Sequence, residues 1–206
     1  MPKADNKSSK SVKSRAPQPQ LRIIGGQWRG RKLSFPLIDG LRPTGDRIRE
    51  TLFNWLTPDV HGARVLDLFA GSGALGLEAL SRGAESCLLI EKHPQAAAQL
   101  VAHLKTLSSD KDTNRGRVST QDGMTLLEQG NKDQPYNLVF IDPPFAADLW
   151  QKIADGLNQG NWLAPDAWIY VETPKDSTWS PPANWSLYRD KQAGQIRYRL
   201  FIFEMS

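Results

Sequence analysis

The arrangement of hydrophobic and polar positions changes near residue 63. From Ala63 onward, short apolar runs alternate with helical stretches, a pattern typical of a parallel sheet with crossover helices. The runs predict seven strands: Arg64–Phe69, Ser86–Glu91, Arg117–Gln121, Tyr136–Ile141, Ala167–Glu172, Ser186–Lys191 and Ile196–Glu204. The stretches between them predict four helices: Ala74–Ser81, Pro94–Leu107, Met124–Gln129 and Ala147–Gln159. Only residues 192–195 separate the last two strands, so we expect these strands to form an antiparallel hairpin.

The first 60 residues follow a different pattern. Residues 1–20 contain Ser, Lys, Pro and Gln with hardly any apolar side chains, so we expect a disordered basic tail. Apolar groups interrupted by glycines in Leu21–Pro36 predict a short β-hairpin. A turn then precedes a helix that Asp46 can cap and that ends before Pro58. The chain thus divides into a tail (1–20), an N-terminal hairpin and helix (21–60) and a main α/β domain (61–206).

Composition narrows the class of protein. The 206 residues, 39% hydrophobic and 23% charged, suit one soluble globular domain with a small extension. The single cysteine, Cys87, excludes an intramolecular disulfide and a Cys-based zinc site, and the three His are scattered, so we expect no metal. No apolar run approaches the roughly 18 residues that span a bilayer. We expect a cytoplasmic monomer with no membrane partner.

Charge is distributed unevenly along the chain. The first 50 residues carry 12 Lys and Arg against 4 Asp and Glu, a net +8, and the remainder carries a net −4. Such asymmetry indicates that the N-terminal region binds a polyanion, although a basic tail that only maintains solubility is an open alternative. The candidate phosphate contacts are Arg22, Arg29, Arg31, Lys32, Arg42, Arg47 and Arg49.

A glycine-rich loop is the first chemical signal. Asp67–Gly76 contains a complete G-x-G-x-x-G, with Gly71 and Gly73 as its first two glycines, between a predicted strand and a predicted helix. Glycines let the backbone approach a ligand closely, and the helix N-terminus offers unpaired N–H groups. Glu91, 20 residues after Gly71, ends the next predicted strand, where a carboxylate can accept both hydroxyls of a ribose.

These features alone leave the choice between NAD and S-adenosylmethionine open. Asp67 favours S-adenosylmethionine, because a carboxylate aimed at the loop would repel a pyrophosphate but would suit a sulfonium and an amino acid ammonium. Asp122, after the third predicted strand, adds a polar group where the adenine would lie. It is equally plausible as a helix cap.

Asp142-Pro143-Pro144-Phe145 is the more specific signal, directly after an apolar strand. Consecutive prolines remove backbone donors and hold the chain extended, which leaves carbonyl oxygens free to accept hydrogen bonds. The exocyclic amine of a nucleobase needs such acceptors, because its lone pair is otherwise delocalised into the ring. Asp142 adds a carboxylate acceptor, and Phe145 adds a ring on which a base can stack. A strand-ending proline turn without chemistry is the structural alternative.

The chain resembles a known family in four blocks: Arg22–Arg31, Leu41–Leu56, Asp67–Gly76 with its continuation to Ala84, and Asp142–Phe145. They are similar to the bacterial 16S ribosomal RNA guanine-N2 methyltransferase family, RsmD. The likeness covers about Leu21 to Glu204. It implies an α/β, Rossmann-like S-adenosylmethionine-dependent methyltransferase fold, in which a mostly parallel seven-stranded sheet has an antiparallel last strand.

The resemblance also implies an activity and roles for particular residues. The activity is methylation of the exocyclic N2 of guanine 966 in small-subunit ribosomal RNA, with S-adenosylhomocysteine as the second product. For the cofactor, it implies Asp67, Gly71 and Gly73 at the methionine end, Glu91 at the ribose and Asp122 at the adenine. For the target base, it implies Asp142, Pro143 and Phe145.

Three other classes of function compete with this one. A DNA adenine-N6 methyltransferase uses similar amine chemistry but normally needs a separate target-recognition domain, for which the N-terminal 50 residues are meagre. A non-catalytic ribosome-binding protein would explain the basic N-terminus but not the full set of predicted active-site residues. A dehydrogenase fits least, because the chain lacks a second domain and an evident hydride-transfer constellation.

Overall fold

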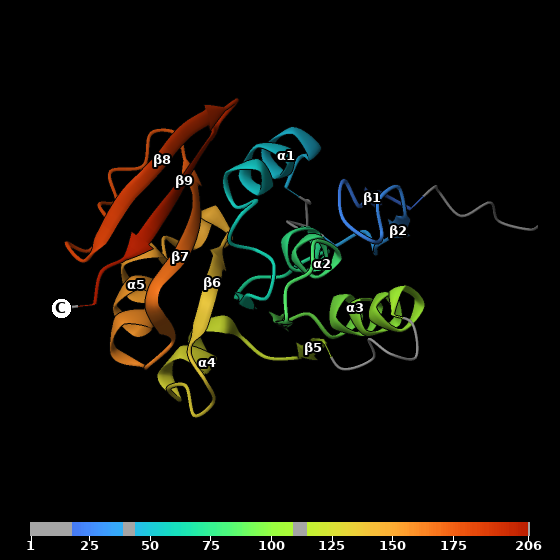
Figure 1. Cartoon of the computed structure of the whole chain (residues 1–206), viewed down its shortest axis with the longest axis horizontal. Helices are drawn as coiled ribbons and strands as arrows, with labels where there is room; N and C mark the ends of the chain where they lie inside the picture. The colour runs from blue at the N-terminus through green and yellow to red at the C-terminus, as the bar shows by residue number, and fades with distance from the viewer. Residues whose placement is uncertain (1–17, 39–43, 109–114, 206) are drawn as a thin grey trace, which may run out of the picture.

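A seven-stranded sheet forms the centre of the computed structural model, which describes residues 18–38, 44–108 and 115–205 (Figure 1). The strand order is β5-β4-β3-β6-β7-β9-β8. The bounds are β3 Arg64–Asp67, β4 Ser86–Ile90, β5 Gly116–Ser119, β6 Tyr136–Ile141, β7 Leu163–Pro174, β8 Trp185–Ala193 and β9 Ile196–Phe203. Strands β3 to β7 pair in parallel, whereas β9 is antiparallel to both β7 and β8. The predicted mostly parallel sheet with an antiparallel last strand is therefore confirmed.

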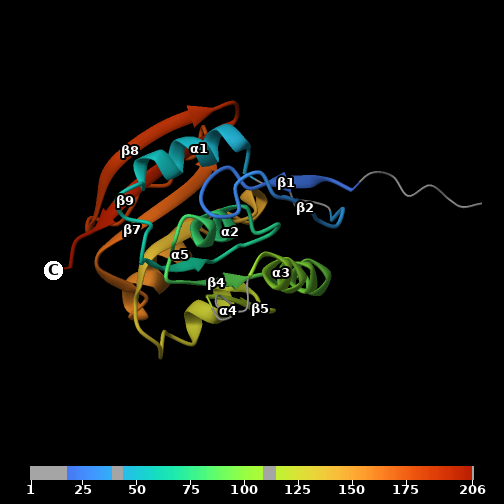
Figure 2. The same ribbon diagram turned by 45° about the vertical axis from the view of Figure 1, so that its right-hand side comes forward.

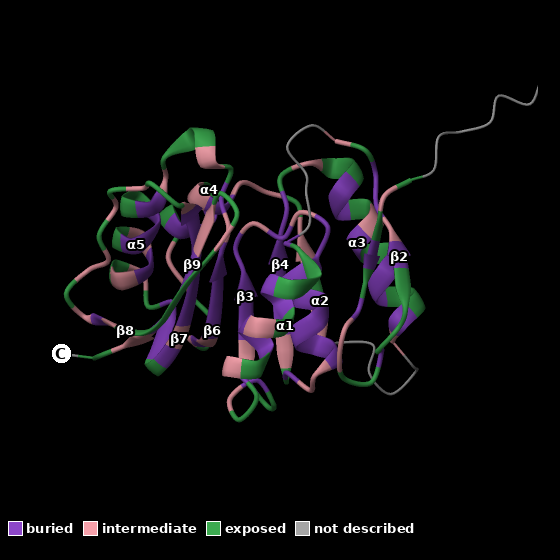
Figure 3. Ribbon diagram, turned by 90° about the horizontal axis from the view of Figure 1, so that it is seen from above, coloured by how far each residue is buried: buried purple, intermediate pink, exposed green. Residues whose placement is uncertain are grey.

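Helices cover both faces of the sheet. Their bounds are α1 Asp46–Trp55, α2 Ala74–Ser81, α3 Pro94–Leu107, α4 Gly123–Glu128 and α5 Trp150–Gln159, with a 3-10 helix at Phe145–Ala147. Successive strand residues point to opposite faces, so Val65 packs in the cluster that contains α1, α2 and α3, and Leu66 packs in the cluster that contains α4 and α5. Figure 3 shows the central strands buried between these layers. No helix in the described part of the chain is long and apolar enough to cross a bilayer.

The N-terminal hairpin packs against the main domain beside α2 and α3 (Figure 2). It pairs β1 (Gln20–Arg22) with β2 (Lys32–Ser34), as predicted. Leu21 belongs to the same hydrophobic cluster as α2. Gly26 has a φ of +75°, and a Cβ at this position would lie 1.9 Å from the carbonyl oxygen of Ser81. The hairpin loop therefore approaches α2 closely only because residue 26 is glycine.

Several element boundaries differ from the predictions. Strand β7 begins at Leu163 instead of Ala167, and α5 begins at Trp150 instead of Ala147. The expected cap by Asp46 is wrong: Gly45 occupies the cap position, no side chain caps α1, and the Asp46 carboxylate pairs with Arg49 at 2.6 Å. Gln20, expected in the tail, is the first residue of β1. The predicted disorder of residues 1–17 lies outside the described residues.

Candidate active site

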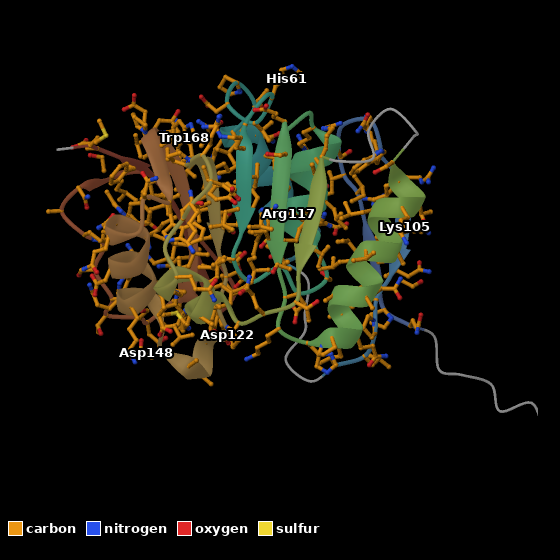
Figure 4. The ribbon with its side chains drawn as sticks, turned by 90° about the horizontal axis from the view of Figure 1, so that it is seen from below. His61, Lys105, Arg117, Asp122, Asp148 and Trp168 are labelled. Atoms are coloured by element: carbon orange, nitrogen blue, oxygen red, sulfur yellow. The ribbon has the colours of Figure 1, made fainter. Side chains whose placement is uncertain are left out.

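The sheet topology brings the predicted site residues to one edge. The chain passes from β3 outward to β4 and β5, then returns to place β6 on the other side of β3, so the strand order reverses between β3 and β6. Ligands of such sheets bind at the carboxyl ends of the strands beside this reversal. In Figure 4, Asp122 and Asp148 lie at this end, and His61 and Trp168 lie at the opposite end.

Glu91 accepts two backbone hydrogen bonds, one of them from the glycine loop. Its Oε2 accepts from the N–H of Gly71 at 2.9 Å, and its Oε1 accepts from the N–H of His93 at 2.7 Å. Gly73, the cap residue of α2, has a φ of +80°, and a Cβ there would meet Leu100 at 2.5 Å. The loop shape thus depends on this glycine and on a carboxylate from the neighbouring strand.

Asp67 lies buried under the same loop. Its Oδ2 accepts from the N–H of Gly76 at 2.9 Å. Burial, and to a smaller extent the nearby carboxylates of Asp142 and Glu91, raise the pKa of Asp67 from 3.8 to about 7, although the hydrogen bond from Gly76 opposes this shift. An approaching cation would favour the ionised form of Asp67, so the site is suited to a positively charged ligand group.

Two buried polar atoms beside the loop are available to a ligand. Ser72 Oγ in the loop and His93 Nδ1 after Glu91 have no hydrogen-bond partner among the residues that the structure describes. Buried polar groups normally have partners, so this donor set fits a polar cofactor such as S-adenosylmethionine. Asp122 caps α4, with Oδ1 accepting from the N–H of Met124 at 2.8 Å, which confirms the cap interpretation. Its contact with adenine stays a prediction.

The Asp142–Phe145 segment leaves β6 at the same edge. Pro143 is buried, and its carbonyl accepts no hydrogen bond from the described residues. Phe145 opens the 3-10 helix and is half-buried, with its ring 5.9 Å from that of Trp150. The segment therefore presents a free carbonyl and part of an aromatic face, as a base-binding site requires.

Two residues without a predicted role, Thr44 and Glu172, lie beside Asp142. Thr44 Oγ1 donates to Asp142 Oδ2 at 3.4 Å, and burial raises the pKa of Asp142 to about 6. Glu172 is 1% exposed and accepts from the hydroxyl of Tyr170 at 2.8 Å. Burial, and then the Asp142 charge, raise the pKa of Glu172 to about 8. Glu172 could have been found by the criterion that found Glu91, an acidic residue at the carboxyl end of a parallel strand. No feature of the sequence predicted that Thr44 would contact Asp142.

The predicted RNA contacts separate into three groups. Five are exposed in the hairpin and at the start of α1: Arg22, Arg29, Arg31, Lys32 and Arg47. Arg42 lies outside the described residues. The prediction that Arg49 contacts a phosphate is wrong. Its side chain is fully buried and pairs with Glu78 at 3.3 Å as well as with Asp46. It lies inward because it is on the buried face of α1, where these carboxylates neutralise its charge.

Comparison with known proteins decides the family. Residues 21–202 match the model of the family described as conserved hypothetical protein 95. Ribosomal RNA small subunit methyltransferase D of Escherichia coli is 51% identical over 183 residues, which cover 88% of this chain and 89% of that protein. The chain belongs to this family, RsmD. The resemblance identified in the sequence is therefore confirmed.

Solved structures extend this result to the fold of the chain. The Escherichia coli protein yhhF is 50% identical, covers 91% of this chain and all of that one, and superposes with a TM-score of 0.81. SMU.776, solved in complex with S-adenosylhomocysteine, is 16% identical, covers 91% of this chain and 57% of its own, and has a TM-score of 0.69. The latter likeness concerns the fold alone. The chain has the predicted Rossmann-like, S-adenosylmethionine-dependent methyltransferase fold.

Proposed function

We propose that this protein transfers a methyl group from S-adenosylmethionine to the exocyclic N2 of guanine 966 in 16S ribosomal RNA. One observation carries the proposal: the Asp142–Phe145 segment leaves β6 beside the glycine loop of β3, at the reversal of strand order. Relatives that are called ribosomal RNA small subunit methyltransferase D support an RNA substrate in the small subunit. Such a substrate agrees with the cytoplasmic location expected from the sequence.

The residues at β3, β4 and β5 would hold the cofactor, which when bound supplies an activated methyl group. Asp67 would face the positively charged groups of the cofactor, and its pKa of about 7 would make its ionisation respond to them. Gly71 and Gly73 would allow close approach of the methionine end. Glu91 retains lone pairs for ribose hydroxyls beyond those that accept from the backbone. Asp122 would contact the adenine.

The residues at β6 would hold the target guanine. Asp142 and the carbonyl of Pro143 would accept hydrogen bonds from the amine, which concentrates its lone pair on nitrogen, and Phe145 would stack on the base. Positioning and electrostatics are sufficient to lower the barrier, so no strong general base is required. As the new N–C bond forms and the bond between the methyl carbon and sulfur breaks, Asp142 or water would take the proton that the amine loses.

The exposed basic residues of the hairpin and α1 would hold the RNA strand by its phosphates. They are the five that the structure leaves exposed: Arg22, Arg29, Arg31, Lys32 and Arg47. Phosphate contacts position a nucleic acid without reading its sequence, so selection of one guanine must come from the site and from RNA shape.

An assay with three substrates tests the proposal. Labelled S-adenosylmethionine is supplied with unmodified small subunits, free 16S ribosomal RNA or duplex DNA, and the products are digested to nucleosides. We expect N2-methylguanosine from a ribosomal substrate, mapped to one position, and no label in DNA. N6-methyladenine in DNA would support the DNA methyltransferase instead, and unlabelled products throughout would support a non-catalytic protein.

A further inference from the structure

Thr44, which lies just before α1, contacts the part of the candidate site that would bind the target base. The residue is 7% exposed, and its hydroxyl contacts Asp142, which lies 98 positions later in the chain. Its carbonyl oxygen accepts from Nε of the buried Arg49 at 3.1 Å. Arg49 in turn pairs with Glu78 of α2, the helix that follows the glycine loop. The backbone at Thr44 is therefore fixed relative to both halves of the site.

Glu172 is the second carboxyl group at this hydroxyl. Ile141 and Val171 are partners in the parallel pairing of β6 with β7, so Asp142 and Glu172 follow at neighbouring positions. Thr44 Oγ1 donates to Asp142 Oδ2 at 3.4 Å, and the same hydroxyl lowers the pKa of Glu172. A threonine hydroxyl has one proton, so it can donate to only one of the two carboxyl groups at a time. The hydrogen bond to Asp142 therefore leaves Glu172 with the Tyr170 hydroxyl as its donor.

We propose that Thr44 is a positioning residue that orients the Asp142 carboxylate toward the target amine through the hydrogen bond from Oγ1 to Oδ2, with Glu172 buried beside the two residues. The role assigned to Asp142 rests on the proposed function. The unit formed by Thr44, Asp142 and Glu172 is a property of the free protein.

The surroundings of the unit favour ionisation of Asp142 before Glu172. Asp67 of β3 and Tyr170 of β7 interact electrostatically with the unit, and Tyr198 of β9 interacts with Tyr170. The hydroxyl of Tyr170 donates to Glu172 Oε1. Burial raises the pKa of both carboxyl groups, to about 6 for Asp142 and about 8 for Glu172, and the Thr44 hydroxyl lowers both. Asp142 therefore loses its proton at a lower pH than Glu172, which makes it the acceptor that Thr44 orients.

The first test measures the unit without any reaction. Carboxyl ¹³C signals of the free protein are titrated by NMR, and the Asp142→Asn and Glu172→Gln variants assign the two steps. We expect Thr44→Val to move the Asp142 step to higher pH by about half a unit or more, because it removes a donor to the carboxylate. Thr44→Ser should keep the wild-type step. An Asp142 step that stays unchanged in Thr44→Val would overturn the proposal.

The second test separates positioning from folding. Single-turnover methyl transfer to small subunits should fall about tenfold in Thr44→Val and recover in Thr44→Ser, with an unchanged Kd for S-adenosylmethionine. The decline of the rate at acid pH should move to higher pH in Thr44→Val. Thr51→Val is the matched control, since Thr51 on α1 donates only to the backbone oxygen of Arg47.

The outcomes distinguish this inference from the proposed function. A Thr44→Val protein that methylates at the wild-type rate with the wild-type pH profile contradicts the positioning role. A wild-type protein that methylates no ribosomal substrate contradicts the proposed function. In that case the NMR titration still decides whether the three residues form the unit.

Discussion

The glycine loop at the end of β3 and the Asp142 segment at the end of β6 are neighbours at one edge of the sheet, but different interactions hold them. Around the loop, carboxylates accept from backbone N–H groups, as Glu91 does from Gly71 and His93. Around Asp142, the partners are side chains from distant parts of the chain, Thr44 and Glu172. The first region is local in sequence, and the second depends on the tertiary structure.

Because different contacts hold the two regions, we expect cofactor binding and methyl transfer to be impaired by different substitutions. Substitutions at the loop should weaken cofactor binding and leave the target acceptors in place. Substitutions around Asp142 should lower turnover and leave cofactor affinity unchanged. Variants in each region therefore test whether the two regions have separate roles or act together.

The largest expected effect is that of Asp142→Ala. Removing a preorganised acceptor from the reacting amine should reduce single-turnover methyl transfer about 10²–10³-fold, by analogy with the loss of one oxyanion-hole donor. The measurement uses unmodified small subunits at saturating cofactor. Asp148→Asn is the control, because Asp148 is an exposed carboxylate in the same loop and asparagine tolerates its left-handed backbone conformation. A folded Asp142→Ala enzyme with normal turnover would remove Asp142 from the mechanism.

Glu91→Ala should have the next largest effect, on the cofactor. The variant loses acceptors for the ribose and for the N–H groups of Gly71 and His93, and each charge-assisted hydrogen bond contributes about 1.5–3 kcal/mol. We expect S-adenosylmethionine to bind about 10–100-fold more weakly in calorimetry. Glu85→Ala, in the turn before β4, is the control. Tighter binding of NAD than of S-adenosylmethionine by the wild-type protein would reject the cofactor assignment.

The sequence predicted these two regions to different extents for a physical reason. The strands, the terminal hairpin and the glycine loop follow from hydrophobic periodicity and from glycine spacing, which act over short distances in the chain. The prediction for Arg49 was wrong because its neighbours in the sequence resemble those of an exposed cation. Only the packing of α1 against α2 shows that Arg49 pairs with Glu78. Thr44 was missed because its chemistry depends on a partner 98 residues away.

The basic hairpin should produce a smaller effect, on RNA affinity. Arg29→Ala combined with Arg31→Ala removes two exposed cations and should weaken RNA binding about tenfold at moderate salt. It should also reduce the slope of log K against log salt concentration by about 1.5–2. The double variant Arg49→Met with Arg29→Ala should show a slope change from Arg29 only. A wild-type slope in the Arg29, Arg31 double variant would place the RNA surface elsewhere.

The smallest effect concerns stability against pH. The pKa of Glu172 is raised from 4.5 to about 8 in the folded protein, so its contribution is fully present below about pH 4 and is lost as pH rises through 8. In Glu172→Gln this loss is absent, so the free energy of unfolding should decrease less between pH 5 and pH 8.5, by at least about 1 kcal/mol. Urea unfolding at both values measures it, with the exposed Glu50→Gln as control. Parallel curves for Glu172→Gln and wild type would contradict a buried, protonated Glu172.

In our proposal, the glycine loop serves cofactor binding and the Asp142 segment serves methyl transfer. This separation of roles is tested most directly by measuring cofactor affinity and single-turnover methyl transfer on the same preparations of Glu91→Ala and Asp142→Ala. Saturating S-adenosylmethionine should restore much of the turnover of Glu91→Ala. It should restore none of the turnover of Asp142→Ala, which should bind the cofactor with wild-type affinity. If both variants lose cofactor affinity to the same extent, or if saturating cofactor rescues both, the two regions do not have separate roles.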